Sequence, residues 1–229
     1  MVVSFGSISC ASKNDAKTVA AAADTGAAED TAPAEDTAPW NTYPEGPYGL
    51  TKGLIFPPLV LKGYAGGIDA KNRGEWTDIK VADLYDPTGE RGINAILIIV
   101  SAEWCPPCRE EAKDLPGFYT NLYQPRGTRF ITTMTQNSKR APADQPTLDR
   151  WVTTFKTNFD IAIDPDEESI PAGSAIPRNY IINPRDMKIY RVNEGVNPDA
   201  TIIPGLNPLL DFNGAPKLPS ATDAGTAGG

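Results

Sequence analysis

The chain has 229 residues, which allows one large domain or two small ones. Its formal net charge is −8, and no basic stripe is present to attract phosphate backbones, so the charge argues against nucleic-acid binding. Histidine is absent and there are three cysteines. This composition excludes Ser-His-Asp and Cys-His catalysis, and it excludes a zinc site built from four cysteine and histidine ligands. The longest apolar run, at 93–100, is too short to span a bilayer.

Residues 1–39 are predicted to be a signal remnant followed by an acidic, Ala- and Pro-rich disordered tether. They contain the tandem repeat AEDTAP at 28–33 and 34–39 and few large apolar side chains, so they bury too little to offset chain entropy. Cys10 ends the sequence GSISC. A small residue before a cysteine, followed by a long tether, is similar to a bacterial lipoprotein attachment site. Cys10 is therefore a candidate for lipidation and membrane tethering; the alternative is a free thiol in the tail.

One folded domain is expected at 40–212, followed by a disordered tail at 213–229. Its first part, 40–92, is an N-terminal extension rich in Pro, Gly and Tyr. Within it, LIFPPLVLKGY predicts one or two short strands at the edge of a sheet, because proline is tolerated mainly at edges. We expect this extension to form a cover on the core at 93–212.

The core alternates strands and helices. Residues 93–101 are β-branched and almost unbroken, as expected for a strand covered on both faces. A helix is expected from Pro106 to about Tyr123, with a bend at Pro116. There follow a strand at 128–136, a helix at 145–159 with a core-facing apolar side, a strand at 160–165, a hairpin of strands at 178–183 and 188–195, and at most a short final helix. This order predicts an α/β fold with a parallel or mixed sheet.

Cys105 and Cys108 stand at the junction of the first core strand and its helix, which is typical of a thioredoxin-like redox pair. At a helix N-terminus, free N–H groups and the helix dipole stabilise a thiolate at Cys105. Cys108 lies one turn on, close enough to attack a mixed disulfide formed at Cys105. Trp104 is expected to shield the pair and leave the first sulfur at the surface. Two alternatives are a purely structural disulfide and a metal site completed by carboxylates.

The sequence AEWCPPC resembles the active site of the thioredoxin superfamily, and CPPCREE is similar to that of its extracytoplasmic TlpA/ResA-like disulfide reductases. SAIPRNYIIN resembles the loop of this family in which a cis-proline precedes a strand. The resemblance implies a thioredoxin-like fold, with a central mixed sheet flanked by helices. It also implies catalytic roles for Cys105 and Cys108. The substrate contacts that it implies come from Trp104, Pro106, Pro107, Ile176 and Pro177.

The chain departs from this family in its acids and prolines. Ile99 stands where thioredoxin has a buried carboxylate, six residues before the first cysteine. Glu103 is the nearest acid by sequence and is the candidate proton-transfer group; the alternative is a solvated acid. Lys113 replaces the helix-kinking proline of the family, and Pro116 comes nearly a turn later.

The resemblance predicts a thiol–disulfide oxidoreductase that needs no metal or organic cofactor. Its partners would be protein disulfide or dithiol substrates and an electron-donating thiol protein, in an extracytoplasmic, periplasmic location. The sequence leaves the direction of electron flow open. One alternative is a thiol peroxidase-like redoxin, although Ala102 stands where such an enzyme carries threonine. A copper-delivering relative would need a histidine. The non-enzymatic alternative is a lipoprotein binding module with a structural disulfide.

Overall fold

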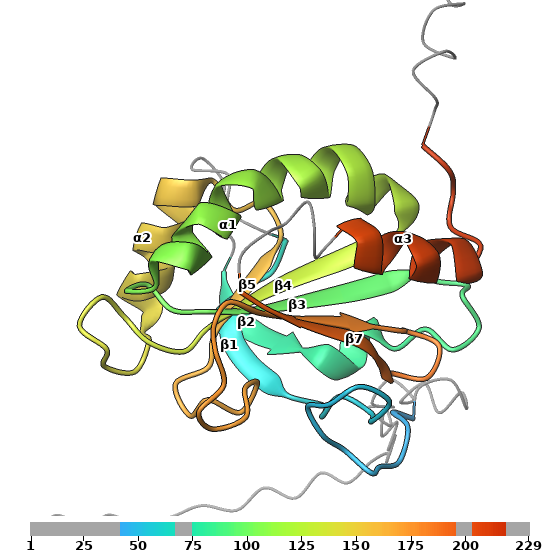
Figure 1. The fold of residues 1–229 in the computed structure, drawn as a ribbon, viewed down its shortest axis with the longest axis horizontal. Coiled ribbons are helices and arrows are strands. Elements are labelled where there is room, and N and C mark those ends of the chain that lie inside the picture. The colour runs from blue at the N-terminus through green and yellow to red at the C-terminus, as the bar shows by residue number, and fades with distance from the viewer. Residues whose placement is uncertain (1–41, 67–74, 196–202, 219–229) are drawn as a thin grey trace, which may run out of the picture. The chain divides into compact units, whose positions relative to one another are not determined.

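A seven-stranded mixed sheet organises the domain (Figure 1). The computed structural model describes residues 42–66, 75–195 and 203–218, so Cys10 and the rest of the predicted tether lie outside the described residues. The strands follow the order β2-β1-β5-β4-β3-β6-β7 across the sheet. The elements in chain order are β1 (Val60–Tyr64), β2 (Trp76–Lys80), a 3₁₀ turn (Val81–Leu84), β3 (Ala95–Ser101), α1 (Pro106–Phe118), a π-helical turn (Tyr119–Tyr123), a 3₁₀ turn (Gln124–Arg126), β4 (Thr128–Met134), α2 (Gln145–Phe155), β5 (Asp160–Ile163), β6 (Arg178–Ile182), β7 (Ile189–Glu194) and α3 (Ile203–Phe212).

The strand β3 is buried along its whole length. It pairs in parallel with β4 and antiparallel with β6. Its Ile and Val side chains suit this position because β-branched residues pack well on both faces of a covered sheet. The prediction of a strand here is confirmed, and so is the order of the core elements that follow it. The helix predicted to reach Tyr123 ends at Phe118 and continues as the π-helical turn, with Pro116 inside α1.

The two faces of the sheet carry different covers. Side chains at the odd positions of β3 pack in one apolar cluster with α1 and α3, which lie together on one face (Figure 1). Those at the even positions pack with Phe56, Val81 and Leu84 of the N-terminal extension. A third cluster joins Leu148 and Trp151 of α2 to the two cysteines. Full burial of one such apolar side chain contributes about 1.5–3 kcal/mol, so all three clusters stabilise the fold.

The N-terminal extension is built into the sheet more deeply than the sequence predicted. β1 was expected at an edge, but it lies between β2 and β5 and pairs antiparallel with both. Pro57 and Pro58 precede the strand instead of interrupting it, so β1 keeps its N–H donors for both neighbours. Gly63 permits the close approach to β5, because a Cβ atom there would lie 2.0 Å from the carbonyl oxygen of Ile161.

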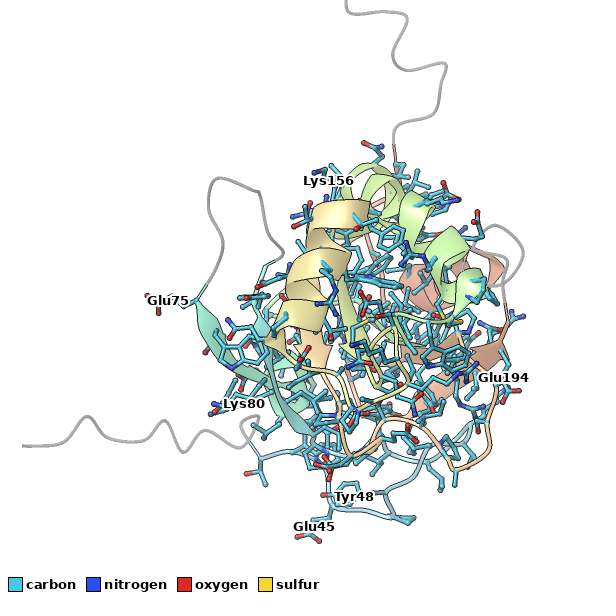
Figure 2. The ribbon with its side chains drawn as sticks, turned by 90° about the vertical axis from the view of Figure 1, so that its left-hand side faces the viewer. Glu45, Tyr48, Glu75, Lys80, Lys156 and Glu194 are labelled. Atoms are coloured by element: carbon cyan, nitrogen blue, oxygen red, sulfur yellow. A yellow bond between two sulfur atoms is a disulfide. The ribbon has the colours of Figure 1, made fainter. Side chains whose placement is uncertain are left out.

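The edges of the sheet are β2 and β7. Figure 2 shows Glu75 and Lys80 at the two ends of β2, and Glu194 on the opposite side of the domain at the end of β7. Lys62 and Asp78 form an ion pair across β1 and β2. Charged side chains on edge strands discourage pairing with other chains, so both edges are protected in this way.

The C-terminal part of the domain extends beyond the boundary predicted at residue 212. α3 is short, as expected, but the N–H groups of Asn213 and Ala215 still donate to carbonyl oxygens of α3, each over 2.9 Å. The side chain of Arg126 is buried and donates to the carbonyl oxygen of Pro216 over 3.0 Å. Residues 213–216 therefore pack on the domain. A buried guanidinium needs hydrogen-bond acceptors, and the carbonyl group of Pro216 supplies one for Arg126. No helix within the described ranges is both long and apolar enough to cross a membrane.

Candidate active site

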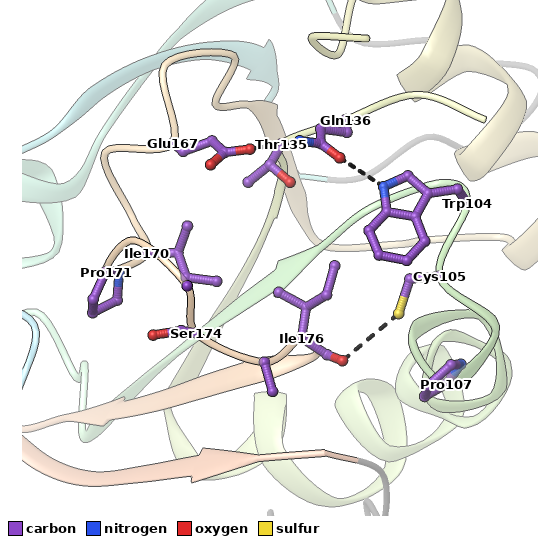
Figure 3. Close-up of a pocket in the computed structure, with 12 residues that line it drawn as sticks. Trp104, Cys105, Pro107, Thr135, Gln136, Glu167, Ile170, Pro171, Ser174 and Ile176 are labelled. Atoms are coloured by element: carbon purple, nitrogen blue, oxygen red, sulfur yellow. Dashed lines mark hydrogen bonds between the residues drawn. The ribbon is translucent and has the colours of Figure 1, made fainter. Parts of the chain in front are cut away.

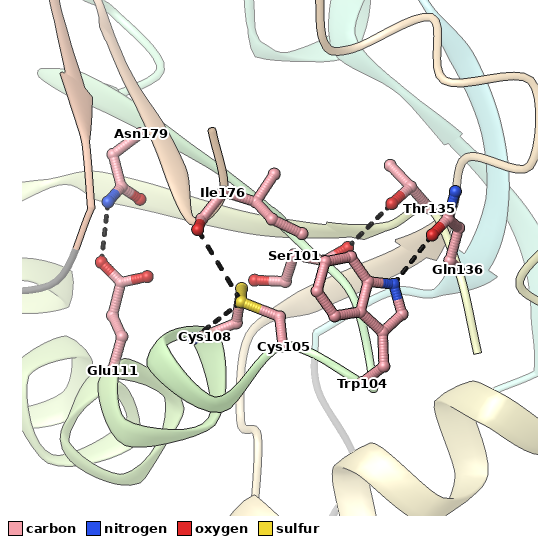
Figure 4. The surroundings of a disulfide bond; sticks show 9 residues. All are labelled: Ser101, Trp104, Cys105, Cys108, Glu111, Thr135, Gln136, Ile176 and Asn179. Atoms are coloured by element: carbon pink, nitrogen blue, oxygen red, sulfur yellow. Dashed lines mark hydrogen bonds between the residues drawn. A yellow bond between two sulfur atoms is a disulfide. The ribbon is translucent and has the colours of Figure 1, made fainter. Parts of the chain in front are cut away.

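Cys105 caps the N-terminus of α1 and forms a disulfide with Cys108 (Figure 4). Pro106 and Pro107 occupy the first turn, where a missing N–H donor costs little. The backbone N–H of Cys108 donates to Cys105 Sγ over 3.2 Å. In the reduced protein, this N–H and the helix dipole would stabilise a thiolate at Cys105. The predicted placement of the pair at a strand–helix junction is confirmed.

Cys105 is one of the residues that line a pocket of about 370 Å³ (Figure 3). Only 2% of Cys105 and 1% of Cys108 is exposed. The expectation that the first sulfur lies at the surface is therefore wrong for the oxidised protein. Trp104 lies on one side of the sulfur, and Ile176 lies on another. A reacting molecule must enter this pocket to reach Cys105.

The peptide bond between Ile176 and Pro177 is cis, as the family resemblance implied. The Ile176 carbonyl oxygen lies 3.8 Å from Cys105 Sγ, so this loop stands directly beside the disulfide (Figure 4). Pro177 has no N–H, which leaves the backbone of Ile176 available to pair with an extended chain. Of the residues predicted to contact substrate, Trp104, Pro107 and Ile176 line the pocket, whereas Pro106 is exposed and Pro177 is buried.

The indole ring of Trp104 is held by a chain of polar contacts. Trp104 Nε1 donates to Gln136 Oε1 over 2.8 Å, and Gln136 Nε2 donates to Glu167 Oε1 over 2.8 Å. The guanidinium of Arg140 lies 3.7 Å from the centre of the Trp104 ring, within range of a cation–π interaction. These contacts fix one wall of the pocket. Gln136, Glu167 and Arg140 were not singled out in the sequence, because they come from loops far from the cysteine motif.

Glu103 has a structural role that contradicts its candidacy for proton transfer. Arg150 donates to both of its carboxylate oxygens, over 2.7 and 2.8 Å, and the backbone N–H of Ser138 donates to it over 2.8 Å. The hydrogen bond from Arg150 is the main reason that the pKa of Glu103 is lowered. A carboxylate held ionised in this way is a poor proton acceptor near neutral pH.

Glu111 is the acid that the sequence analysis missed. It lies three residues after Cys108 on α1 and is fully buried. The side-chain amide of Asn179 donates to its Oε1 over 2.7 Å. Burial raises the pKa of Glu111 to about 7, against the smaller lowering effect of that hydrogen bond. Its helical spacing from Cys108 was the available signal, because residues three apart share a helix face.

The position of Ile99 explains why the acid comes from the helix. Ile99 is buried on β3, on the face that packs against α1. The carboxylate that thioredoxin-like sites place at this strand position is replaced here by an apolar contact. Glu111 supplies a buried carboxyl group from the opposite side of the same interface. The site thus combines a capped sulfur, a cis-proline loop and one acid with a pKa close to neutral pH.

Comparisons with known proteins agree with this geometry. The model of the AhpC/TSA family matches residues 65–191, more than half of the chain. Comparison with curated proteins gave no match. Among solved structures, the chain is similar to a protein from Chlorobium tepidum whose assignment as the thiol:disulfide interchange protein DsbE is provisional, with 18% identity, 71% of this chain and 99% of that chain covered, and a TM-score of 0.53. It is also similar to a secreted thiol-disulfide isomerase from Corynebacterium glutamicum, with 17% identity, 69% and 86% coverage, and a TM-score of 0.50.

The solved structures confirm the thioredoxin-like fold, and the family match places the Cys105–Cys108 pair inside the matched region. The chain belongs to the AhpC/TSA family and carries a Cys-x-x-Cys pair at the start of α1.

Proposed function

We propose that the protein reduces disulfide bonds in other proteins. The observation that carries the proposal is the position of Cys105, which caps α1 and lines a pocket beside the cis Ile176–Pro177 bond. The capped sulfur is suited to ionise, the pocket can admit a substrate sulfur, and the backbone at Ile176 can hold an extended chain. The substrate class is a protein disulfide on an extended segment.

The reaction starts from the reduced pair. The Cys105 thiolate attacks one sulfur of the substrate disulfide, forms a mixed disulfide and releases the other substrate sulfur as a thiolate that takes a proton from water. Cys108 then gives its proton to the carboxylate of Glu111 and attacks Cys105 Sγ. The bond between Cys105 and the substrate breaks, and the second substrate thiolate leaves. The substrate has gained two electrons, and the enzyme holds the Cys105–Cys108 disulfide. A dithiol protein of the same compartment must reduce this bond and so supply the electrons.

Insulin reduction by dithiothreitol tests the proposal. We expect the wild-type protein to accelerate the precipitation of the insulin B chain, and Cys105→Ser to be as slow as dithiothreitol alone. Equal rates for the two proteins would favour the alternative of a binding module with a fixed disulfide. Thermal unfolding of both proteins under non-reducing and reducing conditions controls for the loss of the bridge.

The direction of electron flow depends on the equilibrium potential of the cysteine pair. A reductase is expected to lie below about −200 mV, toward thioredoxin, and an oxidase near about −120 mV. Equilibration with glutathione buffers, followed by thiol alkylation and mass spectrometry, gives this value. A potential near that of strong oxidants would reverse the proposed direction while leaving the roles of the two sulfurs unchanged.

The family also raises the alternative of a thiol peroxidase. Such an enzyme would need threonine at the position of Ala102, which is fully buried here and carries no hydroxyl group. We therefore expect no hydrogen peroxide consumption above the background of the reductant. Measurement of peroxide loss with dithiothreitol as donor checks this; rapid turnover that disappears in Cys105→Ser would establish the peroxidase instead.

We also propose an extracytoplasmic location with a lipid on Cys10. Support comes from the lipoprotein-like sequence around Cys10 and from the secreted protein of Corynebacterium glutamicum to which the fold is similar. In a bacterial host, the wild-type protein should partition into detergent and carry a lipid mass, whereas Cys10→Ala should stay in the aqueous phase. Aqueous partition of both proteins would contradict the anchor.

A further inference from the structure

The pocket that Cys105 lines has one charged side chain in its wall among the described residues, that of Glu167. The rest of the wall is either apolar, as at Ile170, Pro171 and Ile176, or polar and neutral. Ligand pockets commonly combine an apolar lining with a few polar groups that orient what binds. Glu167 is therefore the group best placed to discriminate between substrates.

Contacts of its side chain and of its loop hold the carboxylate of Glu167 in place. Gln136 Nε2 donates to its Oε1 over 2.8 Å, and Figure 3 shows the two side chains next to each other. The backbone of Glu167 has a φ of 58°, in the left-handed region that residues with a side chain rarely adopt. The N–H groups of Glu168 and Ser169 donate to the buried carboxylate of Asp164 over 2.9 and 2.8 Å, which stabilises this turn. The second oxygen, Oε2, accepts no hydrogen bond from the described residues and is available to a ligand.

We propose that Glu167 is a specificity-determining residue that binds a lysine or arginine side chain of the substrate, close in sequence to the disulfide cysteine. The substrate class is then a protein disulfide on an extended segment with a basic residue beside it. The aliphatic stem of that residue can lie along Ile170 and Pro171, while its charged end donates to Oε2 of Glu167. The inference rests on the proposed reduction of protein disulfides and narrows its substrates.

The basic side chains around the active site are engaged elsewhere. Arg140 lies over the ring of Trp104, and Arg150 binds Glu103. Neither arginine is among the residues that line the pocket. Glu167 forms no ion pair within the part of the chain that the structure describes, so its charge is open to a substrate cation. An acidic substrate segment would bring a second carboxylate next to this one, and like charges in a binding site repel.

Paired peptide disulfides test the preference. In each pair, one peptide carries lysine and the other glutamate, at one of the four positions within two residues of the disulfide cysteine, and dithiothreitol supplies the electrons. At the best position, we expect kcat/KM for the lysine peptide to exceed that for the glutamate peptide about fivefold, which corresponds to about 1 kcal/mol, the upper range for an exposed ion pair. Glu167→Gln keeps an acceptor for Gln136 but loses the charge, so this ratio should fall. Glu167→Lys should invert it.

Two controls separate contact with Glu167 from the general attraction of a negatively charged protein for basic peptides. Glu168→Gln removes the same charge from the next residue of the loop, which is exposed and does not line the pocket, so the wild-type ratio should persist. Lysine placed eight residues from the cysteine lies about 26 Å away along an extended chain and should give only the ratio that remains in Glu167→Gln. A wild-type ratio near one, or an equal fall in both glutamine variants, would overturn the inference.

A binding measurement distinguishes this inference from the proposed function. Peptides in which serine replaces the cysteine cannot exchange disulfides, and NMR titration of the oxidised protein gives their affinities. We expect the same preference for lysine and the same loss of it in Glu167→Gln. If the affinities follow this pattern but the wild type reduces no disulfide, the selective pocket stands and the proposed function fails. If the wild type reduces the lysine and glutamate peptides equally fast, the proposed function stands and the inference fails.

Discussion

Arg150 of α2 donates hydrogen bonds to both carboxylate oxygens of Glu103, which lies two residues before Cys105. The same carboxylate accepts the N–H of Ser138, so a helix and a loop are both tied to the segment that carries the cysteines. The side chain of Glu103 is 9% exposed and that of Arg150 is 51% exposed, so a mostly buried acid pairs with a half-exposed base. These contacts hold the segment that leads into the active site.

Removal of Arg150 should destabilise the fold. We expect Arg150→Met to cost about 1–2 kcal/mol at pH 7: a fully buried pair would cost more, but solvent screens the exposed guanidinium. The pKa of Glu103 is lowered in the folded state, so its contribution is present above the ordinary pKa and is lost as pH falls through the lowered value. The difference in the free energy of unfolding between the wild type and Arg150→Met should therefore be smaller at pH 3 than at pH 7. Urea denaturation at both pH values measures it, with Lys139→Met as a control for the change in net charge.

The raised pKa of Glu111 predicts that its contribution to stability changes with pH in the opposite direction to that of Glu103. The folded-state pKa of Glu111, about 7, lies above the unfolded value, so the folded state binds more protons between about pH 4.5 and 7. The free energy of unfolding of the oxidised protein should fall by about 3 kcal/mol as pH rises through this window. Glu111→Gln should abolish the slope and be the more stable protein at pH 8. A wild-type stability that stays flat from pH 5 to 7 would show that Glu111 is already ionised.

The two sulfurs should differ when each is removed alone. In Cys108→Ser, Cys105 can still attack a substrate, but nothing resolves the mixed disulfide, so a covalent adduct should accumulate and multiple turnover should stop. Cys105→Ser should form little adduct, since Cys108 is not among the residues that line the pocket. Non-reducing gels and mass spectrometry of the two variants after incubation with a disulfide-containing protein make the comparison. Equal adduct from both would mean that the order of attack is reversed.

The contact between Trp104 and Gln136 should matter for large substrates. Gln136→Leu removes the acceptor of the indole N–H and should weaken substrate binding by about 1 kcal/mol, or about fivefold in KM. Reduction of a small aromatic disulfide, which needs less of the pocket wall, serves as the matched reaction and should keep its rate. An equal loss of activity toward both substrates would mean that the substitution acts on the reactivity of the cysteines and not on substrate binding.

Local patterns in the sequence were enough to predict the elements and the cysteine site. The β-branched run at 93–101, the two prolines after Cys105 and the sequence around Pro177 each depend on neighbours along the chain. The errors concern contacts between distant segments. Glu111 and Asn179 are 68 residues apart, and the position of β1 depends on its pairing with β5. Spacing within a motif cannot reveal which acid becomes buried, because that depends on what packs over it.

Gly63 allows a test of the position of β1. A Cβ atom at this residue would lie 2.0 Å from the Ile161 carbonyl oxygen, so Gly63→Ala must push β1 away from β5. We expect a loss of about 1–3 kcal/mol or more, the range found for overpacking. Gly53→Ala is a useful comparison, because a Cβ atom there meets no atom within 4 Å but carries the cost of a positive φ. Urea denaturation should rank Gly63→Ala as the less stable variant.

The burial of Cys105 restricts the shape of any disulfide that could reach its sulfur. With 2% of the residue exposed and an indole ring on one flank, this sulfur cannot meet a disulfide that is flush with the surface of a rigid, folded protein. It can meet one that protrudes on a narrow strand or belongs to a chain that has not yet finished folding. If the protein reduces disulfides as proposed, we expect it to act on immature or damaged proteins and to spare the finished bridges of native ones.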